Sequence, residues 1–406
     1  MSGSTERSAL TKNDEVEVTI EKLVAGGDGL ARHLKLPIFV ARSAPGDRLR
    51  VRLTERKLSY ARAEVVKILS PGPGRREPPC RHFGDCGGCD LQHLEDRLQF
   101  EYKAAATLET LERIGRIELP TAELVVGDAW GYRTRTQLHA TPPRERVPDE
   151  QAVVGYHARQ SHRIVVVDEC PVLVPALEKI VRRLRSSLDE ELPQRIDLTV
   201  GDGDTLSTAP VSEGLPHGEV TATVGELVFA FDARCFFQGH RQLLPRLLTA
   251  VIGEGKGAKA VDLYAGVGLF AVPLATRYDR VLAVEGERIA ARYGRLNARR
   301  NGMNNLEAVH RAVESWVADA GTDYDRVVVD PPRSGLSRAV VRWLGQCRSA
   351  TVTYVSCHPA ALARDLAALD GEFEVRALTL IDLFPQTGHI EIVVQLERRR
   401  FLISDF

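Results

Sequence analysis

The chain has 406 residues, a formal net charge of −1, an apolar fraction of 44% and a charged fraction of 27%. The length suggests two or three domains, and the ordinary composition excludes global disorder. No apolar run reaches the roughly 18 residues of a membrane span, and the polar start MSGSTERSALTKNDE lacks an apolar signal core. We therefore expect a cytoplasmic protein with no membrane partner, in which the seven cysteines form no disulfide framework.

The first 69 residues divide into a tail and a β-rich segment. Residues 1–14 are polar and predict a short disordered tail. Residues 15–69 contain short alternating segments such as VEVTI, PIFVA and DRLRVRL, separated by the turn signals GGDG and APGD. This pattern predicts a small barrel of the OB type, a shape that often holds RNA or DNA but that also occurs as a structural appendage. The stretch SPGPGRREPP (70–79) then predicts a linker.

Four cysteines have the spacing of metal ligands. The segment CRHFGDCGGC (80–89), with ECP (169–171) far downstream, gives C-x5-C-x2-C-x80-C. Four thiolates hold either tetrahedral zinc or an iron–sulfur cluster, and this spacing alone leaves both open. The ligands would be Cys80, Cys86, Cys89 and Cys170.

The remainder of the chain changes from a β-rich to an alternating pattern. Residues 94–115 have helical periodicity that stops at Gly115, and residues 131 to about 230 predict strands with one helix. From about residue 240, apolar strands alternate with helices, which predicts a doubly wound parallel sheet of the α/β class. The final stretch, ALTLIDLFPQTGHIEIVVQLE, adds two closing strands. Arginine-rich segments also recur along the chain, and together they favour a basic surface: 48–62, 74–76, 131–137 and 182–185.

The stretch AVDLYAGVGLF predicts a cofactor site. Gly266 and Gly268 form a tight turn after a strand and let the backbone approach a ligand closely. Glu285 stands at the end of the next strand, where a carboxylate can accept both ribose hydroxyls of an adenosine. A dinucleotide and S-adenosylmethionine both satisfy this pattern. The loop RVVVDPPRSG (326–335), which ends a further strand with an Asp-Pro-Pro, favours a methyl donor lying beside an acceptor base.

A cysteine follows the next strand, in YVSCHP. Cys357 opens into the same crevice, so its thiolate can add to carbon 6 of a pyrimidine and turn carbon 5 into a carbanion that accepts a methyl group. The carbon 5 proton must then be removed by a general base. Glu391 in GHIEIVV is the candidate, with His389 as a second one. An isolated cysteine is most often a small buried side chain, the reading that we keep for Cys235 and Cys347.

The motifs DLYAGVG, DPPR, YVSCHPAALARD and LFPQTGHIE resemble, in order, the signatures of the RNA uracil-5-methyltransferase family. FFQGH (236–240) is similar to that family's FFQ-x-N element, and residues 15–69 resemble its TRAM barrel. The resemblance implies Cys357 as nucleophile and Glu391 as base. It also implies a [4Fe–4S] cluster on the four cysteines, and it places a further set around S-adenosylmethionine: Gln238, Tyr264, Glu285 and Asp330.

Three positions depart from the family's pattern. His240, Leu269 and His358 each stand where asparagine is usual or frequent, which leaves the base and the local RNA contacts open. A TRAM barrel together with four cluster cysteines resembles the enzymes that act on large-subunit ribosomal RNA. We therefore expect a monomer that methylates a uridine in 23S rRNA. The alternatives are a transfer-RNA uridine, a cytidine, or a non-catalytic RNA-binding protein of ribosome assembly.

The expected domains follow from these signals. After the tail come the TRAM barrel, a central iron–sulfur domain in two pieces, a helix that packs on the C-terminal domain, and the methyltransferase domain. In order, their ranges are 15–69, then 70–93 with 125–230, then 94–124, and finally 231–406.

Overall fold

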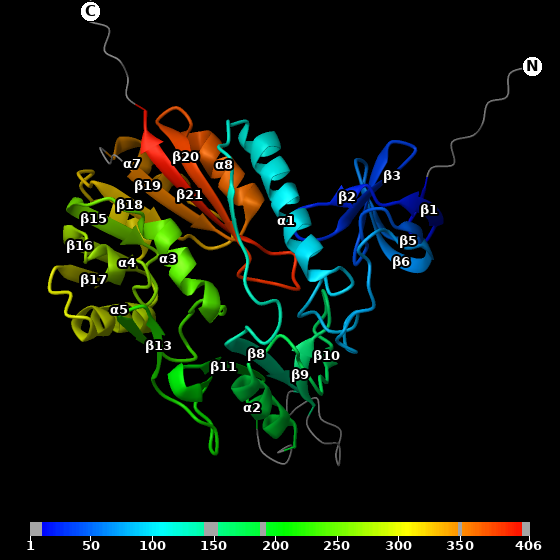
Figure 1. Ribbon diagram of the computed structural model, residues 1–406, viewed down its shortest axis with the longest axis horizontal. Coiled ribbons are helices and arrows are strands. Elements are labelled where there is room, and N and C mark those ends of the chain that lie inside the picture. Colours follow the sequence, from blue (N-terminus) through cyan, green and yellow to red (C-terminus); the bar gives the residue numbers. More distant parts are fainter. Residues whose placement is uncertain (1–9, 142–152, 187–191, 348–350, 400–406) are drawn as a thin grey trace, which may run out of the picture. The chain divides into compact units, whose positions relative to one another are not determined.

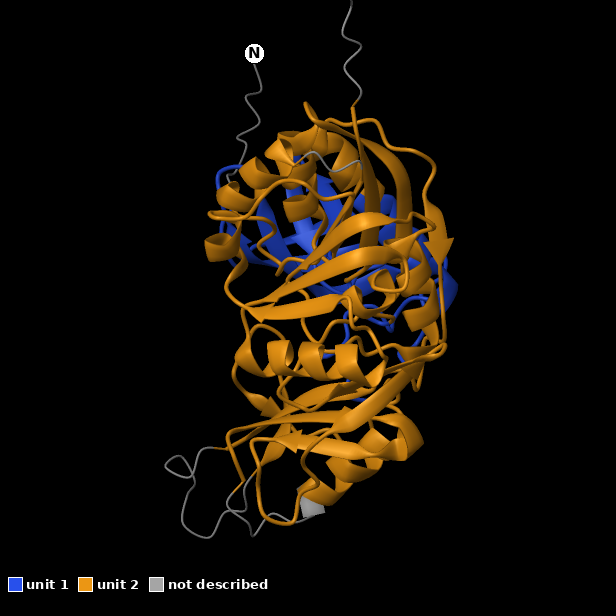
Figure 2. Cartoon of the chain, turned by 90° about the vertical axis from the view of Figure 1, so that its left-hand side faces the viewer, with its two compact units in different colours: residues 1–107, 386–388 blue, residues 108–385, 389–406 orange. Residues whose placement is uncertain are grey.

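The structure, a computed structural model, describes residues 10–141, 153–186, 192–347 and 351–399 (Figure 1). The chain forms two compact units, residues 1–107 with 386–388 and residues 108–385 with 389–406 (Figure 2). Most of the expected tail, residues 1–9, lies outside the described residues. No helix of the described ranges is long and apolar enough to cross a membrane.

The first unit is built on a six-stranded sheet of order β1-β5-β6-β4-β3-β2. In β5, Leu49, Val51 and Leu53 are fully buried while the arginines between them are exposed, so the period of two sends one row of side chains inward. Five of the six strands contribute to one hydrophobic core, as expected for the predicted small barrel. The strands are β1 (Glu15–Thr19), β2 (Lys22–Leu23), β3 (Gly29–His33), β4 (Leu36–Val40), β5 (Arg48–Arg56) and β6 (Ala61–Ser70).

Two segments of this unit are more ordered than the sequence suggested. Leu10 packs against the barrel core, and the Asn13 N–H donates to the Leu53 carbonyl at 2.9 Å, so residues 10–14 are part of the barrel. In the linker, Arg75 pairs with the buried Asp47 at 2.6 Å. Burial opposes ionisation of Asp47, but hydrogen bonds from Arg75 and from two backbone N–H groups outweigh it and lower its pKa. The linker is therefore held against the barrel.

The helix predicted over 94–115 ends at Gly115, as its glycine indicated. It consists of α1 (Asp96–Thr110) and a π-helical turn, Leu111–Gly115. The segment does not belong to the C-terminal domain alone. Residues up to Thr107 group with the first unit, while the π-helical turn packs on α8 (Pro359–Leu369) in the second.

The second unit contains a five-stranded sheet of order β10-β9-β8-β11-β12. One face of it carries apolar side chains, among them Leu138 and Ile196, which share a core with Leu177 and Ile180 of α2. This is the β-rich region with one helix that the sequence predicts. Its elements are β8 (Arg135–Ala140), β9 (Val154–His157), β10 (Ile164–Val165), α2 (Pro175–Ser186), β11 (Arg195–Val200) and β12 (Leu206–Ala209).

The same unit contains an eight-stranded sheet of order β17-β16-β15-β18-β19-β21-β20-β7. Strands β15 to β19 are parallel, and β21 lies antiparallel between β19 and β20, which confirms the predicted doubly wound sheet with two closing strands. The strand order reverses between β15 and β18, the point where open sheets form their ligand crevice. The strands are β7 (Glu123–Val125), β15 (Gly257–Leu263), β16 (Tyr278–Glu285), β17 (Leu306–His310), β18 (Arg326–Val329), β19 (Thr351–Ser356), β20 (Phe373–Ile381) and β21 (Glu391–Arg398).

Helices and one hairpin flank this sheet. The hairpin of β13 (Val220–Val224) and β14 (Leu227–Phe231) shares the hydrophobic core of α3, α4 and α5, so this core begins about ten residues before the expected boundary at 231. The remaining helix α8 packs on α7, and α7 on α6. The helices are α3 (Leu244–Ile252), α4 (Ala271–Leu274), α5 (Arg288–Arg300), α6 (Val313–Val317) and α7 (Arg338–Gln346).

Candidate active site

The glycine turn after β15 is tied to the acidic residue after β16. Tyr264, Gly266 and Gly268 all have positive φ angles, of 63°, 55° and 90°. A Cβ at Gly266 would meet no atom within 4 Å, so its conformation leaves open space beside the backbone. The Gly266 N–H donates to Glu285 at 2.7 Å, and the Glu287 N–H donates to the other carboxylate oxygen at 2.7 Å. The predicted ribose-binding carboxylate is thus fixed in orientation by two backbone groups.

Two buried polar side chains have no partner in full hydrogen-bond geometry among the described residues. Asp262, in β15, is fully buried, and its carboxylate receives only a weak contact from the Ala271 N–H. Burial and the nearby Asp330 raise its pKa well above the usual range. The side-chain oxygen of Gln238 is likewise buried and unpaired. Because buried polar groups are normally paired, these two side chains fit a polar ligand such as S-adenosylmethionine.

Strand pairing brings the thiol and the general base together. Ser356, the last residue of β19, is paired with Ile392 of β21, so Cys357 and Glu391 are the next residues opposite one another. Asp330 follows β18, the parallel neighbour of β19. The three predicted catalytic and cofactor-binding groups therefore meet at the same end of three adjacent strands.

These groups influence each other's protonation. Burial, with Glu391 and Asp330 nearby, raises the pKa of Cys357 to about 11. Burial raises the pKa of Asp330 to about 7, and burial together with Asp330 raises the pKa of Glu391 well above its usual range. In the absence of ligands, the Cys357 thiol is therefore protonated at neutral pH, and burial favours the neutral form of Glu391.

Arg333, whose role is not evident from the sequence alone, opposes this effect. The positive charge of its guanidinium, and a weaker hydrogen bond that it donates to Cys357, lower the pKa of the thiol against the larger effect of burial. It also lies 3.3 Å from Nε2 of His389, the second candidate base. Arg333 occurs in the quoted DPPR motif, so its position four residues after a strand was a usable signal.

The departures at 240, 269 and 358 are explained by packing and capping. His240 is only 1% exposed, stacks on Tyr132 at 4.6 Å and contacts the Asp128 carbonyl through Nε2 at 3.0 Å. This burial contradicts a contact between His240 and an RNA base. Leu269 is part of the hydrophobic core. His358 accepts the Ala361 N–H through Nδ1 at 3.1 Å and so caps α8, a role that asparagine commonly performs.

The four predicted metal ligands are divided between the two units. Cys80, Cys86 and Cys89 lie on one loop of the first unit and are partly exposed, while Cys170 belongs to the second unit. The Gly88 N–H donates to the Cys86 sulfur at 3.4 Å. Within the described ranges, no three His, Cys, Asp or Glu side chains are arranged to hold a metal ion.

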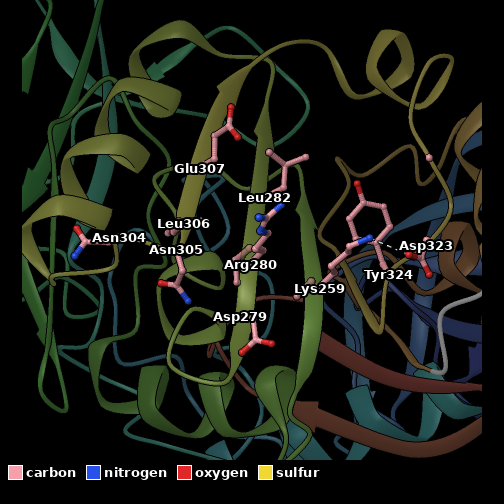
Figure 3. A pocket seen from close by; sticks show the side chains of 13 residues that line it. Lys259, Asp279, Arg280, Leu282, Asn304, Asn305, Leu306, Glu307, Asp323 and Tyr324 are labelled. Atoms are coloured by element: carbon pink, nitrogen blue, oxygen red, sulfur yellow. Dashed lines mark hydrogen bonds and ion pairs between the residues drawn. The ribbon is translucent and has the colours of Figure 1, made fainter.

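A separate cavity of about 600 Å³ lies at the other end of the parallel strands (Figure 3). It is lined near the amino ends of β15, β16 and β17, for example by Lys259, Arg280 and Asn305. The crevice described above lies at the carboxyl ends. No predicted site residue lines this cavity, which is therefore not the cofactor site.

The doubly wound sheet, with its glycine turn, ordered acidic residue and polar loop at the reversal of strand order, defines a methyltransferase that uses S-adenosylmethionine. Known proteins agree with this class. The sequence profile described as tRNA (Uracil-5-)-methyltransferase matches residues 218–399, and the TRAM domain profile matches residues 9–66. These matches confirm the TRAM prediction for the first unit.

Relatives of similar length extend the likeness to the whole chain. The 23S rRNA (uracil(1939)-C(5))-methyltransferase RlmD of Salmonella typhi is 34% identical, with 96% of this chain and 97% of the relative covered. An uncharacterized RNA methyltransferase of Protochlamydia amoebophila is 30% identical, with 96% and 99% covered. The chain therefore belongs to the family of S-adenosylmethionine-dependent RNA uracil-5-methyltransferases.

A solved structure shows the same fold. The crystal structure of Pyrococcus abyssi tRNA (uracil-54, C5)-methyltransferase in complex with S-adenosyl-L-homocysteine superposes with a TM-score of 0.73 at 24% identity. The match covers 94% of this chain and 100% of that one. The predicted fold class is thereby confirmed.

Proposed function

We propose that the protein methylates carbon 5 of a uridine in 23S rRNA, with Cys357 as the nucleophile and Glu391 as the base. The observation that carries this proposal is the pairing of β19 with β21, which sets the two side chains opposite one another beside Asp330. A thiol and a carboxyl group held at one point of a cofactor crevice are the two groups that carbon 5 chemistry requires.

In the proposed reaction, the sulfur of Cys357 adds to carbon 6 of the uracil, and the electron pair moves to carbon 5. S-adenosylmethionine would supply an electrophilic methyl group on a positively charged sulfur, and it would leave as S-adenosylhomocysteine when carbon 5 takes that methyl group. Its charge would also favour the ionised forms of nearby carboxyl groups. After carbon 5 is methylated, the Glu391 carboxylate takes the proton from it. The bond between carbon 6 and sulfur then breaks, and the thiolate is restored.

Arg333 is the group that would stabilise the thiolate. The raised pKa of Cys357 keeps the thiol protonated in the empty site, which protects it from side reactions. A hydrogen bond from a charged donor to a thiolate is stronger than one to a thiol, so Arg333 favours ionisation. This interaction supports a nucleophile that is activated when the site is filled.

Glu391 is a better candidate for the base than His389. Glu391 is 2% exposed and follows directly from the strand pairing that positions Cys357. The Nε2 atom of His389 lies 3.3 Å from the Arg333 guanidinium, so a nitrogen that would accept the proton already faces another group.

The substrate is inferred from the relatives. The RlmD protein named above is called a 23S rRNA uracil methyltransferase and matches 96% of this chain, and the TRAM profile matches residues 9–66. The uracil in these names favours uridine over cytidine. A transfer-RNA uridine remains the second candidate, since the solved structure of the same fold bears the name of a transfer-RNA enzyme.

An iron–sulfur cluster bound by Cys80, Cys86, Cys89 and Cys170 is also part of the proposal. It is supported by the motif resemblance and by the three partly exposed cysteines on one glycine-rich loop. The N–H donor at Cys86 is of the kind that stabilises thiolate ligands. No step of the reaction depends on the cluster.

Nucleoside mass spectrometry tests the function directly. A strain that lacks the protein is complemented with the wild type or with Cys357→Ala, and 5-methyluridine is measured separately in ribosomal and transfer RNA. We expect the modification to return in 23S rRNA only with the wild type, because the variant lacks the nucleophile and should lose at least about 10⁴-fold in rate. Restoration by Cys357→Ala would refute the mechanism, and loss confined to transfer RNA would refute the substrate.

A further inference from the structure

The five-stranded sheet of the second unit has one face that α2 does not cover. Side chains alternate along β8, so that Thr136, Leu138 and Ala140 are buried while Arg135, Gln137 and His139 are only partly buried. The neighbouring strand β11 continues this second face, with Arg195 paired to His139 and Asp197 paired to Gln137. This face, which we call the open face, is polar and carries more positive than negative groups.

Histidines from two strands and a turn form a stacked cluster at one end of the open face. The rings of His139 and His157 are parallel within 17°, with centroids 3.5 Å apart. His162 meets the ring of His157 edge-on at 5.4 Å. Because His139 pairs with Gly155, His157 lies two residues further along β9 and on the same side of the sheet.

Two arginines accompany the histidines around a cavity of about 610 Å³. Arg163 and Arg195 line it, and no carboxylate is among its described lining residues. Asp197 lies beside it and pairs with Arg195 at 2.9 Å, but Arg195 remains largely exposed. The remaining lining residues are Ala140, Thr141, Val153, Ile164 and Gln194.

In this cluster, the histidines supply the stacking surface and the arginines supply the positive charge. Burial lowers the pKa of His139, and His157 and Arg195 lower it further against the weaker opposite effect of Asp197. Burial and His162 lower the pKa of His157. At neutral pH the two rings are therefore neutral, flat and stacked, while the arginines supply the positive charge.

The other end of the open face carries an exposed aromatic ring. Phe236 is 62% exposed, and the guanidinium of Arg135 lies over it at 5.2 Å. Phe236 is two residues from Gln238, the buried side chain assigned to the cofactor site. Arg135 and His139 are four residues apart on one strand, or about 13 Å. The open face thus connects the histidine cluster with the element that carries Gln238.

We propose that the open face binds single-stranded RNA, with His139 and His157 stacking on an unpaired base and Arg163 and Arg195 contacting phosphates. Neutral rings beside cations match RNA, whose bases stack on flat side chains and whose phosphates require positive charge. The Phe236–Arg135 pair is a second stacking position. This inference rests on the proposed function, because it assigns the surface that holds the substrate outside the reacting centre.

The test compares substitutions on the two sides of the sheet. His139→Ala and Arg195→Ala alter the open face, and Arg182→Ala is a matched control on α2, since Arg182 is also an exposed arginine paired with carboxylates. Binding of labelled oligouridine and of unmodified 23S rRNA is measured at several salt concentrations. We expect each open-face variant to bind about tenfold more weakly, and Arg195→Ala to reduce the salt slope by about 0.7.

Two further measurements separate binding from folding and from catalysis. Calorimetric affinity for S-adenosylhomocysteine should be unchanged in all variants, which shows that the fold is intact. In methyl transfer, the open-face variants should raise KM for RNA with kcat nearly unchanged, and Arg182→Ala should behave as the wild type.

Unchanged RNA affinity in both open-face variants overturns the proposal, and points to a protein partner or to no partner for this face. An equal loss in Arg182→Ala also overturns it, because the effect would then be one of net charge. If the wild type transfers no methyl group yet RNA binding depends on His139 and Arg195, the open face is supported while the proposed function fails. If the wild type transfers methyl groups and KM for RNA is unaltered in both variants, the proposed function is supported while the open face fails as an RNA-binding surface.

Discussion

The two sets of cysteines in this chain differ in how far the protein alone prepares them for chemistry. Cys357 follows a buried central strand, and the pairing of that strand with β21 sets Cys357 opposite Glu391. Arg333 donates a hydrogen bond to the Cys357 sulfur. The cysteines of the loop at 80–89 are partly exposed, and the described residues hold no assembled set of ligands. A nucleophile is thus positioned by the sheet, whereas a metal site depends on an added group for its geometry.

After the loss expected from Cys357→Ala, the next largest effect comes from removing the base opposite Cys357. Glu391→Gln should lower turnover by about 10²–10⁴-fold, because proton removal is lost while addition of the thiolate to carbon 6 remains possible. A protein–RNA adduct should then persist through denaturing electrophoresis. Glu397→Gln, the same change further along β21, is the control.

The adduct should be absent when Cys357→Ala is combined with Glu391→Gln. Normal turnover by Glu391→Gln would contradict the assignment and transfer the role to His389 or to another group. The two outcomes show whether the pairing of β19 with β21 correctly identified the nucleophile and the base.

Substitutions in the cysteine loop at 80–89 should change the metal content of the protein more than its activity. Protein purified without oxygen should be brown and contain about four iron and four sulfide per chain, as the cluster type implies. Cys86→Ser should lose the iron, whereas Cys235→Ala, a buried cysteine of the second unit, should retain it. Affinity for S-adenosylhomocysteine should change less than about twofold, since none of the residues assigned to the cofactor belongs to this loop. Stoichiometric zinc without iron would contradict the iron–sulfur assignment.

The smallest expected effect concerns stability. The pKa of Asp330 is raised from 3.8 to about 7, so the folded protein holds this proton more tightly than the unfolded chain does. The stability that the bound proton contributes is fully present below pH 3.8 and is lost as the pH rises through 7. Asp330→Asn should therefore increase the unfolding free energy of the ligand-free protein at pH 8 by roughly 1–3 kcal/mol, after allowance for its coupling to Glu391.

Chemical denaturation at pH 8 and pH 5 measures this difference, which should be smaller at pH 5. Affinity for S-adenosylmethionine should fall in the same variant. Greater stability of the wild type at pH 8 would show that Asp330 is not held at a cost in the empty crevice.

The sequence predicted the parts of the molecule whose signals are local. The alternating strands of the barrel, the glycine turn and the doubly wound parallel sheet follow from period and turn chemistry, and the structure has them. The short strand β7 (Glu123–Val125) was not expected, because three residues are too few to show alternation. The β13–β14 hairpin shares the core of α3, α4 and α5, which its sequence pattern does not reveal.

The functional groups that were missed are those defined by neighbours in space. Asp262 stood inside a quoted motif, but only its burial without a partner marks it. Arg333 resembled a solvated loop arginine until its bond to Cys357 was seen. His139, His157 and His162 are scattered along the sequence, and the pairing of β8 with β9 brings them together.

The antiparallel insertion of β21 has a mechanical consequence. Glu391 begins β21, and Cys357 directly follows the last residue of β19 that pairs with β21, so a bend of the sheet would move both residues together. A slip of a single residue between β19 and β21 would instead turn Glu391 to the opposite face and abolish the pair. The described strands β19 and β21 are hydrogen-bonded neighbours at this point. The stiffness of their pairing therefore fixes the distance over which the proton is transferred.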